Sequence, residues 1–259
     1  MNLQSSSVDS DRWFICPQPS QAAKTRLFLF PYAGGGPAVF SKWGREFSGD
    51  IEAWVAHYPG RGARHKEPPI NSLAVLVEKF ALAIQPFLDK PFVFFGHSLG
   101  GLLAFELARR LRRQNHSQPA ILFISACGAP DLPDPYPPAH LLPDAEFLAA
   151  VQKFNGIPIE LLQQTELMQI LLPMLRADVE AVENYRYTAD VPRLNIPIIA
   201  FGGLDDPRVD RERIEGWALQ TVSNFSSQYF PGDHFFLNAA RESIITSITA
   251  EVISFHAKK

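Results

Sequence analysis

The most constraining feature of this sequence is a short apolar run that ends in glycines and leads directly into a helical pattern. Residues 91–101 read PFVFFGHSLGG, and the centre of this segment fits the pattern Gly-x-Ser-x-Gly. The pattern is typical of a nucleophile elbow, a sharp strand-to-helix turn that holds a serine in strained backbone geometry above a sheet. Such a turn needs Gly96 and Gly100, because a side chain at either position would collide with the neighbouring element. We therefore predict that Ser98 is an exposed catalytic nucleophile; the alternative is a tight surface turn.

The residues after the serine have the spacing of a buried amphipathic helix. From about Leu99 on, Leu103, Leu107 and Leu111 recur at four-residue intervals and so share one face. Positive charge then gathers at residues 109–113, where it stabilises a helix C-terminus. A strand before the serine and a helix after it favour the elbow over the surface turn.

Apolar segments and helical patterns alternate along much of the chain, which predicts an α/β fold with a mostly parallel central sheet and helices on both faces. A 46% hydrophobic content over residues 1–259 is enough for one large core, so we expect a single domain in which residues 1–10 are disordered. Besides the strand before the serine, strands are expected at 24–30, 51–57, 120–126, 196–201 and 228–230, and helices at 72–88 and 242–256.

The alternation breaks between residues 129 and 190. Six prolines fall between 130 and 143, and helical patterns follow at 144–154, 159–163 and 165–187, the last with an expected kink at Pro173. A helical insertion between two core strands is typical of a lid over an active site. We take Phe147, Val151 and Met174 as candidate substrate-binding residues of an acyl pocket. The alternative is that they only pack the insertion onto the core.

A glycine-rich loop, PYAGGGP at residues 31–37, follows the first long strand. It is not a nucleotide-binding loop, because it lacks both the G-x-G-x-x-G spacing and a following Gly-Lys-Ser/Thr. An elbow serine needs a second backbone donor from the loop after an early strand. We therefore predict an oxyanion hole formed by the backbone N–H groups of Ala33 and Leu99.

A nucleophilic serine also needs a base and an orienting carboxylate, which follow it along the chain in the order acid, then histidine. Asp205 and Asp206 come after a late strand, and His234 lies in a glycine-flanked loop after the next one. His97 is adjacent to the serine, but we expect it to point into the sheet and pack there. At this point either aspartate could serve as the acid.

Charge and cysteine content limit the partners. The net charge is −3, so no global basic field would attract nucleic acid or an anionic membrane. Cys16 and Cys127 are too few for a metal cluster or a disulfide framework, which fits a reducing cytosol. No signal-peptide pattern and no run of about 18 apolar residues is present. We expect a cytoplasmic protein with no membrane or nucleic-acid partner.

Five segments in order identify a family resemblance. Together they resemble the type II thioesterases, stand-alone α/β-hydrolases that accompany polyketide and non-ribosomal peptide synthetases. The resemblance runs from about residue 25 to 255, and its one departure is Leu99, where the family commonly has methionine. A backbone amide is unaffected by that exchange. The segments are FPYAGG at 30–35, YPGRG at 58–62, FGHSLGG at 95–101, GLDDP at 203–207 and GDHFFL at 232–237.

The resemblance implies a helical lid on an α/β-hydrolase fold and the hydrolysis of acyl groups from the phosphopantetheine arm of acyl or peptidyl carrier proteins, which clears stalled synthetases. It implies no cofactor and no metal. The family pattern Gly-x-x-Asp-Pro selects Asp206 over Asp205, so the expected triad is Ser98, Asp206 and His234. A carboxylesterase or lipase with the same triad is the rival enzyme. A catalytically inactive binding protein is the rival of another class, which the complete triad argues against.

Carrier proteins of this kind are acidic, whereas this chain is itself slightly negative, so docking would need a local basic surface. Arg61 and Arg64, with His65 and Lys66, follow the C-terminal end of a predicted strand, on the side where Ser98 emerges. We take Arg61 and Arg64 as candidate docking residues of a monomeric enzyme. The alternative is that they hold their own loop by hydrogen bonds to local carbonyl groups.

Overall fold

A central sheet organises the fold in the computed structural model, which describes residues 10, 12–47, 49–154, 164–189 and 192–258. Within these residues the sheet has seven strands in the order β1-β3-β2-β4-β5-β6-β7. All neighbouring strands are parallel except the antiparallel pair of β1 and β3. The strands are β1 (Phe14–Ile15), β2 (Thr25–Phe30), β3 (Ile51–Ala56), β4 (Phe92–His97), β5 (Leu122–Ser125), β6 (Ile198–Gly203) and β7 (Phe225–Phe230). The prediction of a mostly parallel sheet is confirmed, although the sequence did not reveal β1 as a strand.

Apolar side chains alternate between the two faces of the central strands. In β2, Phe28 and Phe30 pack into the core on one face, whereas Leu27 and Leu29 pack into the core on the other. Strands that are buried on both faces have continuous apolar sequences rather than alternating ones. The continuous apolar sequence of β2 therefore reflects burial on both faces of the sheet.

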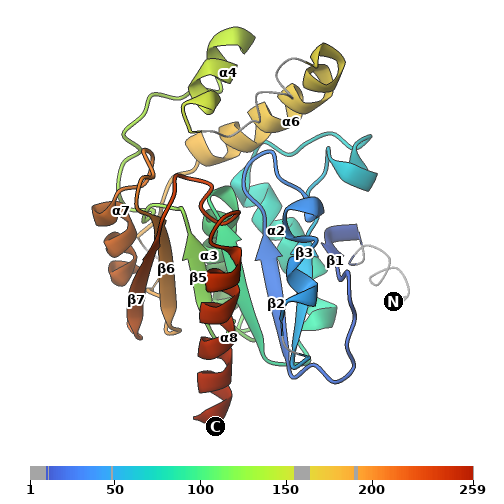
Figure 1. The fold of residues 1–259 in the computed structure, drawn as a ribbon, viewed down its shortest axis with the longest axis vertical. Helices are drawn as coiled ribbons and strands as arrows, with labels where there is room; N and C mark the ends of the chain where they lie inside the picture. The colour runs from blue at the N-terminus through green and yellow to red at the C-terminus, as the bar shows by residue number, and fades with distance from the viewer. Residues whose placement is uncertain (1–9, 11, 48, 155–163, 190–191, 259) are drawn as a thin grey trace.

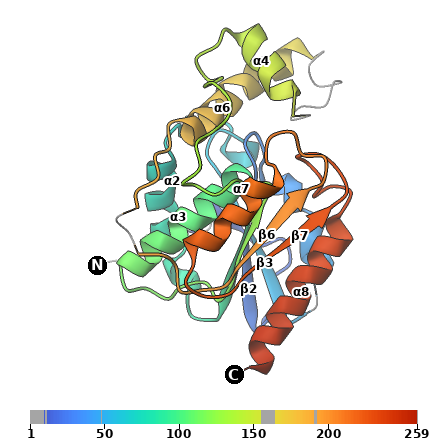
Figure 2. The same cartoon turned by 90° about the vertical axis from the view of Figure 1, so that its left-hand side faces the viewer.

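Helices cover both faces of the sheet (Figures 1 and 2). Helices α2 (Leu73–Ala83), α3 (Leu99–Arg113) and α7 (Arg211–Glu215) lie on one face, and α8 (Arg241–Ala257) lies on the other. Helix α2 ends before the predicted residue 88, because Pro86 cannot continue the helix and a short 3₁₀ turn takes over at Gln85–Phe87.

The insertion between β5 and β6 lies beyond the C-terminal ends of the strands (Figure 2). In its described part it contains helices α4 (Asp144–Gln152) and α6 (Thr165–Glu183) and no strand, as predicted. Pro173 lies inside α6. The predicted helical segment 159–163 falls outside the described residues, as do residues 1–9 of the segment expected to be disordered; Ser10 is buried.

The strand order reverses next to β2. The chain runs from β2 outward to β3, then crosses back to β4 on the other side of β2. The loops that follow β2 and β4 therefore leave the sheet in different directions, and in open parallel sheets this switch point is where ligands bind. This strand order places the glycine-rich loop beside the serine elbow.

No helix in the described residues is long and apolar enough to cross a membrane.

Candidate active site

The turn after β4 holds Ser98 in a strained conformation. Its φ is 54° and its ψ is −118°, so the backbone lies in a region that residues other than glycine rarely adopt. A Cβ atom at Gly96 would lie 2.1 Å from the carbonyl oxygen of Gly100, and one at Gly100 would lie 2.0 Å from that of Phe30. Both glycines are therefore required sterically, as the elbow pattern predicted.

Hydrogen bonds connect the serine to a histidine and a carboxylate that follow later strands. Nε2 of His234 lies 3.1 Å from Oγ of Ser98, and Nδ1 of His234 lies 2.8 Å from Oδ2 of Asp206. The other oxygen of Asp206 accepts the backbone N–H groups of Arg208 at 2.8 Å and Val209 at 3.2 Å. These two bonds fix the carboxylate, which in turn orients the imidazole ring toward the serine.

The two adjacent aspartates have different environments. Asp206 is buried against His234, whereas Asp205 is exposed and its backbone N–H donates to the carbonyl of Gly232. The structure therefore places Asp206, the residue chosen from the family pattern, beside the histidine. Asp205 instead contributes a backbone hydrogen bond to the Gly232 carbonyl and keeps its side chain in solvent.

His97 has a role that the sequence did not reveal. Its Nε2 lies 2.9 Å from the carbonyl oxygen of His234, and its Nδ1 lies 2.9 Å from Oγ of Ser125. A carbonyl only accepts hydrogen bonds, so Nε2 carries the proton and the Ser125 hydroxyl donates to Nδ1. Complete burial holds the pKa of His97 well below 6.5, which keeps the ring neutral. His97 thus packs in the sheet, as expected, and also holds the backbone of the catalytic histidine candidate.

The two predicted oxyanion donors lie near Ser98: Leu99 follows it in the chain, and Ala33 shares the wall of a cavity with it. Leu99 is the first residue of α3, where the backbone N–H has no partner within the helix. Ala33 lies in the glycine-rich loop, between a turn bond from Gly35 N–H to the Tyr32 carbonyl and a bond from Gly34 N–H to Asp178. Among the described residues, no group accepts a hydrogen bond from the N–H of Ala33 or Leu99. Both donors are free to bind a developing oxyanion.

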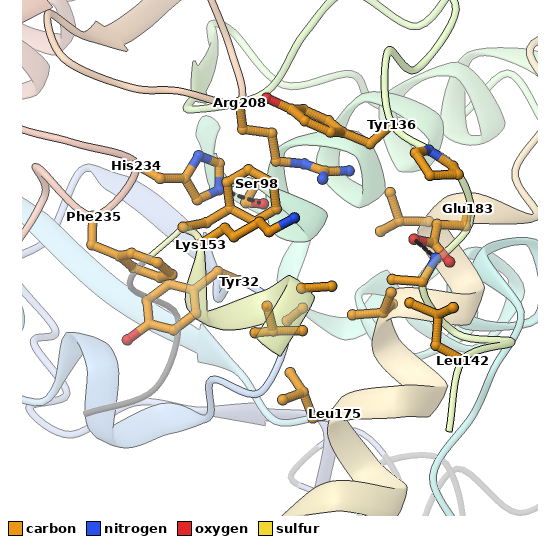
Figure 3. A pocket seen from close by; sticks show the side chains of 18 residues that line it. Tyr32, Ser98, Tyr136, Leu142, Lys153, Leu175, Glu183, Arg208, His234 and Phe235 are labelled. Atoms are coloured by element: carbon orange, nitrogen blue, oxygen red, sulfur yellow. Dashed lines mark hydrogen bonds between the residues drawn. The ribbon is translucent and has the colours of Figure 1, made fainter. Parts of the chain in front are cut away.

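Two cavities meet at Ser98. The first has a volume of about 230 Å³ and a mostly apolar wall (Figure 3). The second, of about 540 Å³, lies between the proline-rich segment 130–135 and the end of α6, and includes Cys127. Burial raises the pKa of the Cys127 thiol to about 12, so it is not a competing nucleophile at neutral pH. The wall of the first cavity includes Tyr32, Ala33, Ala139, Leu142, Ala150, Val151, Phe154, Leu175, Val179, Val182 and Phe235.

Only one of the three predicted substrate-binding residues lines the apolar cavity. Val151 is on its wall, whereas Phe147 and Met174 are buried in the packing of the insertion. The Phe147 ring packs beneath the guanidinium of Arg176, whose Cζ lies 4.2 Å from the ring centroid. Leu175, the residue after Met174, lines the cavity instead. Phe147 and Met174 lie outside the wall of this cavity, because both side chains are buried in the packing of the insertion.

The proposed basic docking surface is also corrected. Arg64 is buried, donates to the His57 carbonyl at 2.6 Å and pairs with Glu67 at 2.7 Å. Its Cζ also lies 4.2 Å from the Trp13 ring centroid. Arg61 is buried and pairs with Asp178 of α6. Neither guanidinium is exposed for docking; both stabilise the loop and its contacts, which is the alternative stated above.

Arg208 is a further site residue that sequence reasoning missed. It lies in the wall of the first cavity with Ser98 (Figure 3) and also lines the second cavity. Its guanidinium pairs with Asp134 at 2.8 Å. It also lies 5.6 Å from the Tyr136 ring and 5.1 Å from the Phe154 ring, measured from Cζ to the centroids. Arg208 therefore connects the loop of Asp206 with the insertion. The sequence feature that could have indicated Arg208 is its position two residues after Asp206.

No group of three or more His, Cys, Asp or Glu side chains that could hold a metal ion occurs in the described part of the chain. The arrangement suits acyl transfer, because a serine, a histidine and a carboxylate form a hydrogen-bonded chain beside an apolar cavity whose wall includes Ala33.

Comparison with known proteins gives a consistent result. Residues 25–252 match the thioesterase domain family. The gramicidin S biosynthesis protein GrsT of Aneurinibacillus migulanus is 43% identical over 91% of both chains. Thioesterase PikA5 of Streptomyces venezuelae is 33% identical over 95% of this chain and 88% of its own.

Solved structures agree. The type II thioesterase BorB of the borrelidin cluster has a TM-score of 0.85 at 31% identity, over 93% of this chain and 97% of its own. The type II thioesterase YbtT of the yersiniabactin pathway has a TM-score of 0.83 at 30% identity, over 92% and 97%. The chain therefore belongs to the thioesterase family and is a type II thioesterase, a serine hydrolase with the α/β-hydrolase fold.

Proposed function

We propose that this enzyme hydrolyses acyl groups from the phosphopantetheine arm of carrier proteins and thereby clears stalled or wrongly primed synthetases. The observation that carries the proposal is the hydrogen-bonded chain from Ser98 through His234 to Asp206 at the mouth of an apolar cavity. The pathways named for relatives support the substrate class, since gramicidin S, borrelidin and yersiniabactin proteins are among them.

Catalysis proceeds through an acyl-enzyme. The Oγ of Ser98 attacks the thioester carbonyl while Nε2 of His234 takes its proton, and the Nδ1–H of His234 stays bonded to Asp206. The backbone N–H groups of Ala33 and Leu99 stabilise the oxyanion. The imidazolium returns its proton to the departing pantetheine sulfur, which leaves as a thiol. A water molecule, deprotonated by the same histidine, then hydrolyses the serine ester.

The test compares three substrates that carry the same acyl chain: an acyl-carrier protein, an acyl-coenzyme A and an oxygen ester. We expect the highest kcat/KM on the carrier. A higher value on coenzyme A would contradict the carrier as substrate, and preference for the oxygen ester would indicate a carboxylesterase.

The Ser98→Ala variant is the control for the mechanism. It should fold normally, lose turnover on all three substrates and lose labelling by a fluorophosphonate. Retained labelling in this variant would contradict the assignment of Ser98 as the nucleophile.

A further inference from the structure

A buried carboxylate of the lid contacts the loop that carries the oxyanion donor Ala33. Oδ2 of Asp178, in α6, accepts the backbone N–H of Gly34 at 2.7 Å. Only 1% of the Asp178 side chain is exposed. A hydrogen bond from an N–H to a buried carboxylate is short and strong, so this contact restrains the loop firmly.

Arg61 contacts both this carboxylate and the same loop. Its Nη1 and Nη2 lie 2.7 and 2.8 Å from the two oxygens of Asp178, and Nη1 also donates to the Gly35 carbonyl at 3.0 Å. The bidentate geometry fixes the guanidinium and the carboxylate relative to each other. The pair therefore holds one N–H and one carbonyl of adjacent residues in the loop.

These contacts determine where the Ala33 N–H points. The Ala33 N–H belongs to the same peptide group as the Tyr32 carbonyl, and the two point in opposite directions. Because the Tyr32 carbonyl accepts the Gly35 N–H at 2.9 Å, the direction of the Ala33 N–H is restrained as well. On the other side of Ala33, the next peptide is fixed by the bond from Gly34 N–H to Asp178. Both peptides that flank Ala33 are thus restrained, one by the turn and one by the lid helix.

Close packing confirms that α6 approaches the loop closely at this point. Gly34 has a φ of +79°, and a Cβ atom there would lie 3.1 Å from Cδ1 of Leu175, one turn before Asp178. The loop conformation and the position of α6 are therefore coupled.

We propose that Asp178 is a positioning residue that, together with Arg61, aligns the Ala33 N–H with the oxyanion. The proposal rests on the proposed function and deepens it: the C-terminal half of the lid helix is part of the catalytic machinery. Because an oxyanion exists only in the transition state and the tetrahedral intermediate, a displaced donor should lower kcat and leave KM nearly unchanged.

The test uses a variant that removes both charges. Replacing one partner of a buried ion pair leaves an unpaired charge in the interior and strongly destabilises the fold. Replacing both partners with apolar residues of similar volume is often neutral for stability. The Arg61→Met/Asp178→Leu variant should therefore fold while Gly34 N–H loses its acceptor. We expect kcat per active site, counted by fluorophosphonate titration, to fall about 10- to 100-fold. Affinity for an alkyl boronic acid, whose tetrahedral adduct places an oxygen in the oxyanion hole, should fall by a similar factor.

The matched control is Asp144→Asn, which removes an exposed lid ion pair to Arg176 that does not contact the oxyanion loop. Its kcat per site should equal that of the wild type. If the double variant does not fold, Arg61→Lys replaces it: the ammonium keeps the Asp178 charge paired but cannot bond both carboxylate oxygens and the Gly35 carbonyl in the same fixed geometry, so we expect kcat to fall about tenfold.

An unchanged kcat per titrated site, or a rise in KM alone, would overturn the positioning role. A Ser98→Ala variant that still turns over would overturn the proposed function instead, so the two failures are distinguishable.

Discussion

The imidazole of His97 donates a hydrogen bond from Nε2 to the backbone carbonyl of His234 over 2.9 Å. The residue before Ser98 thus holds the loop of His234, although the two histidines are 137 positions apart in the chain. Strand β4 therefore both presents Ser98 and, through His97, helps to set the position of His234 relative to Ser98. The elbow and the histidine loop are therefore directly connected by this hydrogen bond.

The first prediction follows from this contact. His97→Leu leaves the His234 carbonyl buried and without its donor, which allows the histidine loop to shift. We expect kcat to fall about 10- to 100-fold, as for a displacement of about 1 Å at a catalytic group. His97→Gln places an amide N–H near the former Nε2 and should recover much of the rate. Equal losses in both variants would show that the hydrogen bond is not what His97 supplies.

The second prediction concerns the dependence of stability on pH. Burial, reinforced by the neighbouring His234, holds the pKa of His97 well below the 6.5 of an unfolded chain. Below pH 6.5 the unfolded state therefore binds a proton that the folded state does not, so stability falls as the pH falls. One such group contributes at most about 1.4 kcal/mol per pH unit.

Urea unfolding at pH 7.5, 6.5 and 5.5 would measure this slope, and His97→Gln should reduce it. Some slope should remain in that variant, because burial also lowers the pKa of His57. An unchanged slope in His97→Gln would contradict the assignment.

The turn at Ser98 and the contact of His234 with Ser98 and Asp206 were predictable because each depends on local chemistry or on strand order. Gly96 and Gly100 are required by contacts within a few residues, and the order of acid and histidine follows from the order of the strands. The choice between Asp205 and Asp206 needed the family pattern, since the sequence alone does not tell which of two adjacent carboxylates faces inward.

Other parts of the site depend on how distant elements dock. Asp178 was detectable as the one acid within an apolar stripe of α6, but its partner Arg61 lies 117 positions away. Val151 and Phe147 are one turn apart on α4, yet only Val151 reaches the cavity. Which of them does so is set by the rotation of the helix on the core, which hydrophobic periodicity does not specify at this precision.

The third prediction tests the choice of acid. Asp206→Asn can no longer stabilise the tautomer that presents Nε2 to Ser98, and kcat should fall by about 10⁴, as in the trypsin family. Asp205→Asn, at an exposed position, is the matched control and should retain nearly full activity. A greater loss in the Asp205 variant would show that the loop rearranges during catalysis.

The fourth prediction assigns Arg64 to stability. Arg64→Met leaves the buried His57 carbonyl without a donor and should lower the free energy of unfolding by about 1–3 kcal/mol. Arg64 is also the main reason that the pKa of Glu67 is lowered to about 2. That contribution to stability is complete above pH 4.5 and disappears as the pH falls through 2, so in acid the difference in stability between wild type and variant should shrink to the part caused by the unpaired His57 carbonyl. A rise in KM confined to carrier substrates would restore a docking role.

The last prediction concerns motion of the lid. Helix α4 buries a single residue, Phe147, so little packing opposes its opening. The C-terminal half of α6 is different, because Asp178 and Arg61 bind it to the oxyanion loop through a buried ion pair.

The two halves of the insertion should therefore differ in hydrogen exchange. We expect residues 144–152 to exchange much faster than residues 175–183, whose protection should approach that of β4 and β6. The Arg61→Met/Asp178→Leu variant should lose the protection of 175–183 while that of the strands stays unchanged. Uniformly fast exchange across both helices in the wild type would mean that the whole insertion opens as one body, and that the oxyanion loop is released with it.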